Sequence, residues 1–432
     1  MTSEIAIMNK EAIALASDSA VTAMSESGEK IFTSVNKLFA LSKYHPVGIM
    51  IYGSATFMGV PWETIIKVYR NNLGEKSFNT LEEYAMDFIS FLDNGNPMFP
   101  DFVQEEYLRN YIYEYFNFIR SKIVEKVHSV IDEEGGILDE DIEKIVSETI
   151  AEHYEKLEKV DNIPSIPSNF SENIIKKYSA IIDKAIKDIF EELPISEIHY
   201  NQLRKISGNL FSKFPEDVRD DTISGVVIAG FGEKDIFPSL ISFYLDGVIE
   251  NKLKYKKHIS AKIDYETDAV IVPFAQREMV ITFMEGIDPL YIVVEEDYLS
   301  QIFKEYAEIV VEYLDKYTTE EKNELKAKLI DIGNQILEDL KGRLEKFRHE
   351  TYISPITSVV SMLPKDELAA MAESLVNLTS LKRKFSMESE TVGGPIDVAV
   401  ISKGDGFIWI KRKHYFKAEQ NPQFFANYYK GG

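Results

Sequence analysis

The stretch SEIAIMNKEAIALAS, residues 3–17, decides the fold. It holds two apolar runs, 5–8 and 12–16, on either side of the polar residues 9–11. Two short apolar runs separated by a few polar residues are typical of a β-hairpin. Polar and apolar residues alternate little within the runs, so we expect both faces of their sheet to be covered.

Outward from this hairpin, further apolar runs predict strands. They lie at 38–41, 47–52, 224–231, 240–245, 270–273, 396–401 and 407–410. The pair Asp246-Gly247 is expected to turn the chain after residue 245. Helical spacing of apolar residues occupies 79–94, 103–131, 138–160, 171–192, 274–286, 297–317, 320–347 and 366–381. This order predicts an α+β chain with two sheets between helical layers.

The composition fits a globular protein and excludes several kinds of chemistry. A length of 432 residues allows two or three domains, or one domain with large insertions. The 48 basic and 71 acidic side chains give 48 − 71 = −23, a charge that repels phosphate backbones, so we expect no nucleic-acid partner. The absence of cysteine excludes thiolate nucleophiles, disulfides and cysteine zinc sites. The seven histidines are scattered, and we expect no metal or other cofactor.

The beginning of the sequence, MTSEIAIMNK, lacks the basic start and apolar run of a signal peptide. The chain also has no stretch of about 20 apolar residues that would span a bilayer. We therefore expect a cytoplasmic protein with no membrane partner.

Three residues near the hairpin bear groups that suit catalysis together. Removal of Met1 would expose Thr2, which joins a hydroxyl nucleophile to an α-amine whose pKa of about 7.7–8.0 suits a general base. Asp18 follows the second strand, so we expect it beside the start of the first. Lys37 opens the next strand, and burial beside Asp18 would let it lower the pKa of the amine. The commoner interpretations are an uncut N-terminus, an Asx-turn and an exposed edge lysine.

These residues resemble those of a known family. The segment 2–69 resembles a proteasome β-subunit, within the N-terminal nucleophile (Ntn) hydrolases. Thr2 and Asp18 are 18 − 2 = 16 positions apart, as in the family, and ASDSAVT at 16–22 matches its pattern around the catalytic aspartate. VNKL at 35–38 matches the strand that the catalytic lysine opens, with Lys30 as the competing candidate. Farther on, VVIAGF at 226–231 and VGGPID at 392–397 resemble later segments of the family.

The resemblance implies a particular architecture. The chain would be a bacterial proteasome-like homologue folded as a four-layer αββα sandwich of two antiparallel sheets, with a large inserted helical subdomain. Residues 1–74 would form the first part of the Ntn-hydrolase domain and 75–195 the helical insertion. Residues 196–432 would complete the domain, with extra helices at about 300–360.

The resemblance also implies the residues of an active site. The catalytic set is Thr2, Asp18, Lys37 and Gly53, the last through a backbone N–H that binds the oxyanion. The supporting set is Ser19, Tyr52, Ser389 and Thr391. Tyr52-Gly53 stands where the family has Gly-Gly, and the sequence around 389–391 departs from the family's supporting serine and aspartate.

The activity implied is that of a threonine-type peptidase which hydrolyses peptide bonds through an N-terminal threonine. Such a protein would act on peptides or unfolded proteins, form a homo-oligomer and work with an ATPase or adaptor partner. Two alternatives stay open. One is an Ntn amidohydrolase acting on a small-molecule amide, and the other is a non-catalytic assembly or binding protein that retains Met1.

Overall fold

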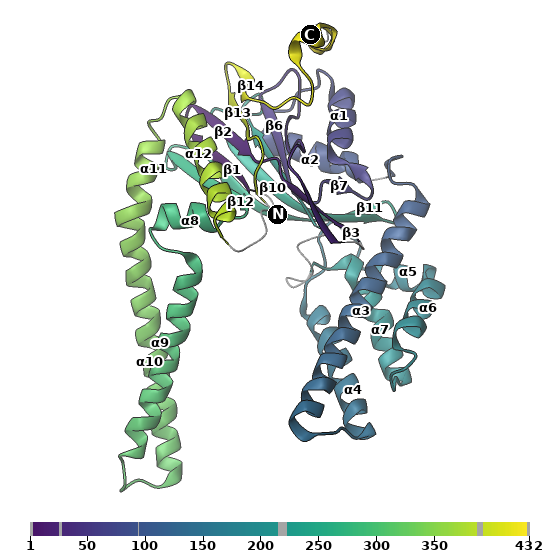
Figure 1. Cartoon of the computed structure of the whole chain (residues 1–432), viewed down its shortest axis with the longest axis vertical. Helices are drawn as coiled ribbons and strands as arrows, with labels where there is room; N and C mark the ends of the chain where they lie inside the picture. The colour runs from purple at the N-terminus through teal and green to yellow at the C-terminus, as the bar shows by residue number, and fades with distance from the viewer. Residues whose placement is uncertain (1–2, 26–27, 94, 215–222, 387–391, 430–432) are drawn as a thin grey trace. The chain divides into compact units, whose positions relative to one another are not determined.

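The computed structural model describes the whole chain except residues 1–2, 26–27, 94, 215–222, 387–391 and 430–432 (Figure 1). The described residues form an α+β protein with two five-stranded sheets and two short strand pairs. The predicted α+β class with two sheets is therefore confirmed at this level. The four-layer arrangement of sheets and helices stays a prediction.

The first sheet contains the hairpin predicted at the start of the chain. Its strand order is β12-β1-β2-β13-β14. The bounds are Ser3–Asn9 for β1, Ala12–Ser17 for β2, Ala269–Ala275 for β12, Asp397–Ser402 for β13 and Gly406–Lys411 for β14. All these neighbours pair antiparallel, and Glu4 of β1 lies opposite both Ser17 and Phe274. The end of β2 therefore lies beside the beginning of β1.

Helix α12, Lys365–Lys384, covers one face of this sheet. The sheet contributes small side chains there, Ala12, Ala14 and Ala16, together with Ile5 and Ile7. Alanines at alternate positions let the helix approach the strand closely, and all of these residues are buried. Every residue of β1 and β2 is buried, so both faces of these strands are covered, which explains why they lack the polar alternation of a half-exposed strand.

The second sheet has the strand order β11-β10-β9-β6-β5. The bounds are Leu38–Ala40 for β5, Val47–Gly53 for β6, Ser224–Gly230 for β9, Ser239–Ile249 for β10 and Lys252–Lys262 for β11. Strand β11 was not predicted because its sequence, KLKYKKHISAK, is rich in lysine. The two short pairs, not predicted either, join β3, Val21–Ser25, to β4, Gly28–Phe32, and β7, Thr56–Phe57, to β8, Val60–Pro61.

The expected turn at Asp246-Gly247 is wrong, because both residues lie inside β10. The chain turns instead at Glu250-Asn251, where both φ angles are positive, 52° and 55°, as in a tight hairpin turn. Asp246 forms a buried ion pair with Lys254 of the next strand, with Nζ and Oδ2 2.6 Å apart. At Gly247 the ring of Tyr107 occupies the place that a side chain would need. The presence of an aspartate and a glycine here is explained by their packing inside the protein and not by a turn.

The chain divides into two compact units. One comprises 1–52, 229–239 and 261–432, and the other comprises 53–228 and 240–260. The second unit contains the helices α1 to α7. Their bounds are Trp62–Leu73, Leu81–Leu92, Asp101–Glu134, Asp139–Lys159, Phe170–Lys177, Ser179–Phe190 and Glu197–Ser212. Residues of α3 to α7, joined by Ile249 of β10, build an apolar core around Ile112, Phe116 and Phe190. The domain limits at 74 and 195 stay predictions.

The remaining helices belong to the first unit. They are α8, Glu278–Glu285, α9, Pro289–Glu312, α10, Thr319–Arg348, α11, Ser354–Val360, and α13, Pro422–Tyr429, besides α12. A π-helical turn, His349–Ile353, joins α10 to α11. Helices α9 and α10 run side by side as a long hairpin (Figure 1). Thr318 begins α10 with a capping box, in which its side chain and that of Glu321 bind each other's backbone N–H.

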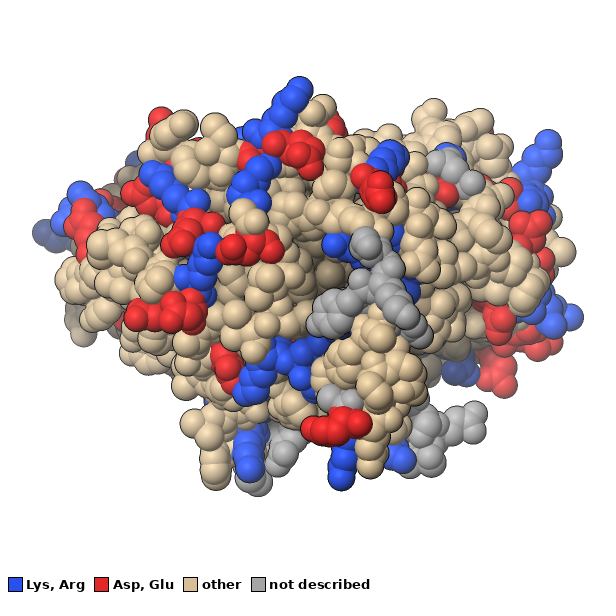
Figure 2. Space-filling model, turned by 90° about the horizontal axis from the view of Figure 1, so that it is seen from above, with Lys and Arg blue, Asp and Glu red and all other residues tan. Residues whose placement is uncertain are grey.

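Charged side chains of both signs are interspersed over the face that Figure 2 presents. Opposite charges there lie near one another, which limits the local repulsion that a net charge of −23 would cause. Within the described residues, no helix combines the length and apolar composition that a membrane crossing requires.

Candidate active site

Asp18 is the centre of the candidate site. It follows β2, its side chain is wholly buried, and both carboxylate oxygens accept hydrogen bonds. Oδ1 accepts from Lys37 Nζ at 2.7 Å and from the backbone N–H of Ser3 at 3.2 Å. Oδ2 accepts from the backbone N–H of Ala20 at 3.2 Å and of Gly393 at 3.0 Å. These four donors replace the hydrogen bonds to water that burial removes.

Lys37 is the cation of the site. It lies directly before β5, is 3% exposed, and its backbone C=O accepts a hydrogen bond from the N–H of Ile51 at 2.9 Å. The competing candidate, Lys30, lies in β4 with an exposed side chain, its Nζ 5.2 Å from the ring centre of Phe32. The structure therefore brings Asp18 together with Lys37. A buried pair of this kind is costly to break, since one unpaired charge would remain inside.

Glu4 is a second buried carboxyl beside this pair, and sequence reasoning missed it. It is 1% exposed in β1, and its Oε1 accepts a hydrogen bond from Ser17 Oγ at 3.2 Å. Its Oε2 has no hydrogen-bond partner among the described residues. Burial raises the pKa of Glu4 well above its usual range; the charge of Lys37 opposes the shift and that of Asp18 adds to it. A glutamate inside the apolar run SEIAIM was the available signal.

A loop before β13 closes the site against Asp18 and Ser19. Ser19 is buried, its N–H donates to the C=O of Gly393 at 3.1 Å, and its Oγ donates to the C=O of Pro395. At Gly394 φ is 79°, and a Cβ there would lie 2.5 Å from the C=O oxygen of Thr33. Glycine is thus required at 394 by backbone conformation and close approach. Ser19, predicted as a supporting residue, here fixes the backbone of this loop.

Tyr52 and Gly53, expected to flank an oxyanion site, end strand β6. Tyr52 is buried, and its ring centre lies 5.6 Å from that of Phe274 in β12. Gly53 is exposed with φ of 83°, and a side chain there would collide with the C=O oxygen of Ile223. Only glycine suits this position.

Three predicted site residues, Thr2, Ser389 and Thr391, lie outside the described residues. Within the described part of the chain, no group of three or more acidic or histidine side chains is arranged to hold a metal ion.

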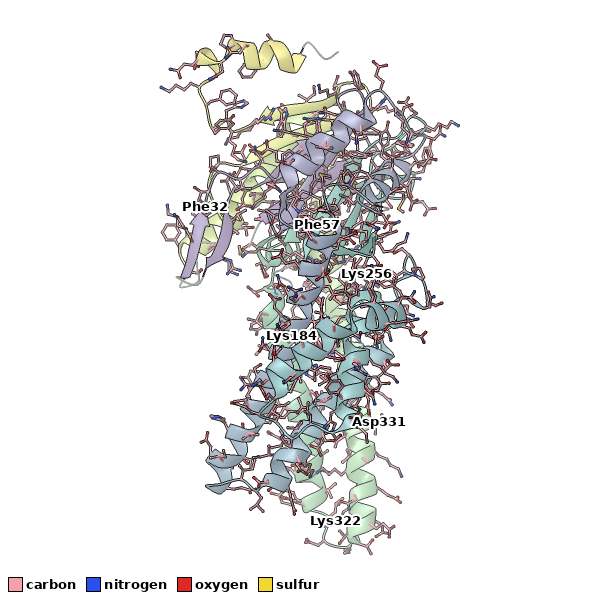
Figure 3. All side chains as sticks on the ribbon, turned by 90° about the vertical axis from the view of Figure 1, so that its right-hand side faces the viewer. Phe32, Phe57, Lys184, Lys256, Lys322 and Asp331 are labelled. Carbon is pink, nitrogen blue, oxygen red and sulfur yellow. The ribbon has the colours of Figure 1, made fainter. Side chains whose placement is uncertain are left out.

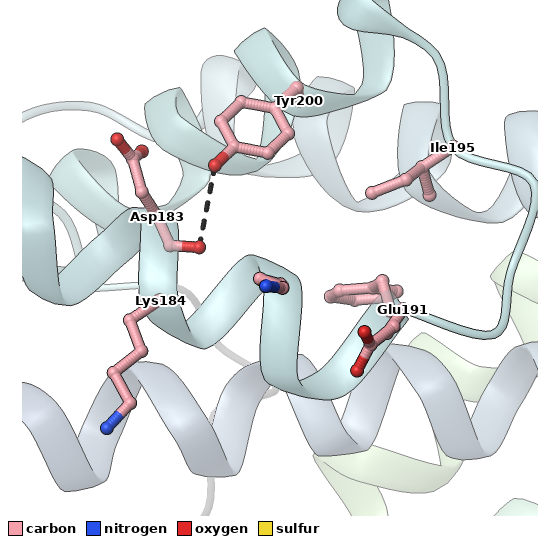
Figure 4. A pocket seen from close by; sticks show the side chains of 7 residues that line it. Asp183, Lys184, Glu191, Ile195 and Tyr200 are labelled. Atoms are coloured by element: carbon pink, nitrogen blue, oxygen red, sulfur yellow. Dashed lines mark hydrogen bonds between the residues drawn. The ribbon is translucent and has the colours of Figure 1, made fainter.

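A surface pocket of about 490 Å³ lies between α6 and α7 in the other unit (Figure 4). Its lining includes Asp183, Lys184, Glu191 and Tyr200, and the Tyr200 hydroxyl donates to the C=O of Asp183 at 3.4 Å. Arg204 binds both carboxylate oxygens of Asp183, at 2.8 and 2.7 Å. None of the predicted site residues that the structure describes lines this pocket, and the ion pair with Arg204 already satisfies the Asp183 carboxylate.

Comparison with known proteins adds little to what the geometry of the candidate site indicates. No family model matches the chain. No curated protein matches it either. Among solved structures, a Gly-1 mutant of Anbu from Hyphomicrobium sp. strain MC1 aligns with 8% identity and a TM-score of 0.27, over 100% of this chain and 94% of that one. Anbu (ancestral beta-subunit) from Yersinia bercovieri aligns with 8% identity and a TM-score of 0.26, over 99% and 95%.

The expectation that the chain is a proteasome β-subunit-like homologue with a large helical insertion is therefore wrong. Alignments at TM-scores of 0.27 and 0.26 with 8% identity do not establish a shared fold. The motifs behind the expectation are short, and most lie around the hairpin at 3–17. They fix a local arrangement of strands and leave the path of the remaining chain undetermined, including α9, α10 and the helices of the other unit.

Proposed function

We propose that the chain hydrolyses amide bonds of peptides with Thr2 as an N-terminal nucleophile. One observation carries the proposal: the N–H of Ser3 donates to Asp18, which also binds the buried Lys37. Ser3 is covalently joined to Thr2, and adjacent Cα atoms are about 3.8 Å apart. The proposal requires cleavage before Thr2, which would place a free amine and a hydroxyl within one residue of the ion pair.

The chemistry follows the rules of nucleophilic catalysis. The Thr2 hydroxyl oxygen attacks the amide carbonyl carbon while the free α-amine accepts the hydroxyl proton. The amine then gives that proton to the departing nitrogen, which leaves an acyl ester on Thr2. Water attacks the ester, and a proton returns to the threonine oxygen as the acid departs. Each bond formed is matched by one broken, and no further reactant is needed.

The described residues would support these steps in distinct ways. The Lys37 charge lowers the pKa of the neighbouring amine and stabilises negative charge on the hydroxyl oxygen. Asp18 holds Lys37 and the backbone at Ser3 in place. We assign the oxyanion contact to the N–H of Gly53 at the end of β6, beside Tyr52; such a donor is worth about 3 kcal/mol.

The experiment compares the parent chain with Thr2→Ala and Thr2→Ser on fluorogenic peptide amides and a panel of small amides. Alanine removes the nucleophile, so hydrolysis should fall by about 10³-fold or more. Serine keeps both the hydroxyl and the amine and should retain measurable turnover. Intact-mass measurement of each protein should show a chain that begins at residue 2.

Three outcomes would contradict the proposal: undiminished hydrolysis by Thr2→Ala, retention of Met1 by an active parent, and no hydrolysis by a correctly cut parent. Small amides cleaved in preference to peptides would identify the substrate as a small molecule. An inactive chain that retains Met1 would favour an assembly or binding protein.

A further inference from the structure

Helix α9 carries an exposed stripe of large apolar side chains. The residues recur every three or four positions along the helix: Tyr291, Val294, Tyr298, Ile302, Tyr306, Ile309 and Tyr313. Their exposed fractions run from 41% at Val294 to 83% at Tyr313. Such a spacing places them on one face of the helix. A stripe this long lies outside the scatter of single apolar residues normal for a protein surface.

Helix α10 adds a second exposed set, Ile332, Ile336 and Phe347. The two helices pack through other residues: a Cβ at Gly333 would lie 2.9 Å from Phe303 Cβ, and Ala307, Val311 and Leu337 are buried. Two ion pairs cross the hairpin, Glu308 with Lys326 at 2.7 Å and Glu296 with Lys341 at 3.1 Å. The exposed sets are therefore not part of the contact between α9 and α10.

Both exposed sets lie on the same side of the hairpin. Ile302 precedes the inward-facing Phe303, and Ile332 precedes the inward-facing Gly333. In each helix, a residue lies about 100° around the helix axis from the residue that follows it. The rotation has the same sense in both helices when each is followed along its own chain. Because the helices are antiparallel and face each other, equal rotations bring both sets to one side. We call the residues of these two sets the apolar face of the hairpin.

The size of the apolar face suits a stable protein contact. The 24 residues of α9 span about 36 Å, and two adjacent helices are about 20 Å wide, so the side of the hairpin that carries the apolar face measures about 700 Å². A standard interface buries about 800 Å² on each partner. Tyrosine and isoleucine side chains supply the large apolar contacts that dominate binding energy.

The charges beside the apolar face indicate a second copy as the partner. Helix α9 has six carboxylates and one lysine, whereas α10 has seven basic and seven acidic side chains. Glu305 and Glu312 of α9 and Lys328 of α10 have no ion-pair partner among the described residues. In Figure 3, Lys322 lies near one end of the hairpin and Asp331 farther along α10. The acidic edge of α9 also opposes binding to an anionic lipid surface.

We infer that the apolar face of the α9–α10 hairpin binds the same face of a second copy of this chain. A two-fold axis along the hairpin places α9 of each copy against α10 of the other, so the acidic helix meets the one with more basic side chains. The result is a bundle of four helices in which neighbours run antiparallel. The inference does not depend on the hydrolytic chemistry.

The first test is the mass of the full chain in solution, measured by light scattering. The parent should have at least twice the 49.4 kDa of one chain. Tyr298→Glu with Ile302→Glu, and separately Ile332→Glu with Ile336→Glu, should each raise the dissociation constant by about 100-fold or more. Ile236→Glu with Tyr265→Glu changes two exposed residues outside the hairpin and should leave the mass unchanged. Circular dichroism confirms that each variant is folded.

The second test uses the absence of native cysteine. A mixture of Ile302→Cys and Ile336→Cys chains should form a disulfide-linked heterodimer on mild oxidation. A monomeric parent would overturn the inference, including one that sediments with phosphatidylserine vesicles or with another protein. So would an unchanged mass in both glutamate variants, or cross-linking only between two Ile302→Cys chains, which would pair α9 with α9.

Discussion

At the scale of single residues, the Asp18 carboxylate decides how the candidate site is held. It accepts hydrogen bonds from Lys37 and from three backbone N–H groups that belong to separate segments. The spacing of Thr2, Asp18 and Lys37 in the sequence predicted which side chains belong to the candidate site. Both Lys37 and Lys30 precede apolar residues, and Lys37 was preferred because the strand after it leads through a turn into residues 48–55. Only the packed structure shows which lysine is buried beside the carboxylate.

Glu4 gives a pH-dependent prediction at the same scale. Because the pKa of Glu4 is higher in the folded than in the unfolded chain, its contribution to stability is present at low pH and is lost as the pH rises through the folded pKa. Glu4→Gln is neutral at every pH. Its free energy of unfolding should therefore exceed that of the parent increasingly from pH 5 to 8, by about 1.4 kcal/mol for each unit of raised pKa.

Urea unfolding at several pH values measures this difference. The exposed Glu106→Gln serves as the control and should run parallel to the parent. A Glu4→Gln curve that also runs parallel to the parent would show that the Glu4 carboxyl is not held neutral.

At the scale of elements, strands with apolar sequences could be predicted and those with polar sequences could not. The hairpin at 3–17 was found because both of its faces are covered. Strand β11 was missed because lysines fill most of its exposed positions, and β10 was cut short because Asp246-Gly247 has the composition of a turn. The partners that reverse this interpretation, Lys254 and Tyr107, come from elsewhere in the chain. Tertiary contacts of this kind are not visible in local sequence.

The glycine pair before β13 supports a prediction about an element's conformation. Gly394→Ala would place a Cβ 2.5 Å from the Thr33 C=O oxygen at a φ of 79°, so it should lower the free energy of unfolding by about 1–3 kcal/mol. Gly404→Ala is the matched control, because a Cβ there meets nothing within 4 Å. Chemical denaturation of both variants tests the difference. Equal stabilities would show that the loop relaxes around the added methyl group.

At the scale of the whole molecule, short motifs predicted the local strands and misled about the family. The α+β class followed from the order of apolar runs and helical segments. The length of the α9–α10 hairpin and the core formed by α3 to α7 depend on contacts that no motif describes. The apolar face of the α9–α10 hairpin was likewise not predicted. The sequence does not show which apolar side chains of the two helices pack between them and which stay exposed.

The structure of the α9–α10 hairpin also allows a prediction about a shortened chain. The apolar cluster of α12 and the first sheet includes no residue of α9 or α10. Replacing 297–340 by a short Gly-Ser linker should therefore leave the melting temperature within a few degrees of the parent and leave the hydrolysis proposed above unchanged. Calorimetry and peptide assays measure both, and light scattering should show loss of self-association. A shortened chain that fails to fold would show that the hairpin contributes to the core.

The hydrogen bond from Gly393 to Asp18 joins residues 375 positions apart. A polypeptide emerging from the ribosome has its first forty residues long before it has Gly393, and domains acquire their tertiary structure as synthesis proceeds. The ion pair can receive this donor only after residue 393 has been made. The hydrolysis proposed above would thus be withheld from nascent chains that have not reached this residue.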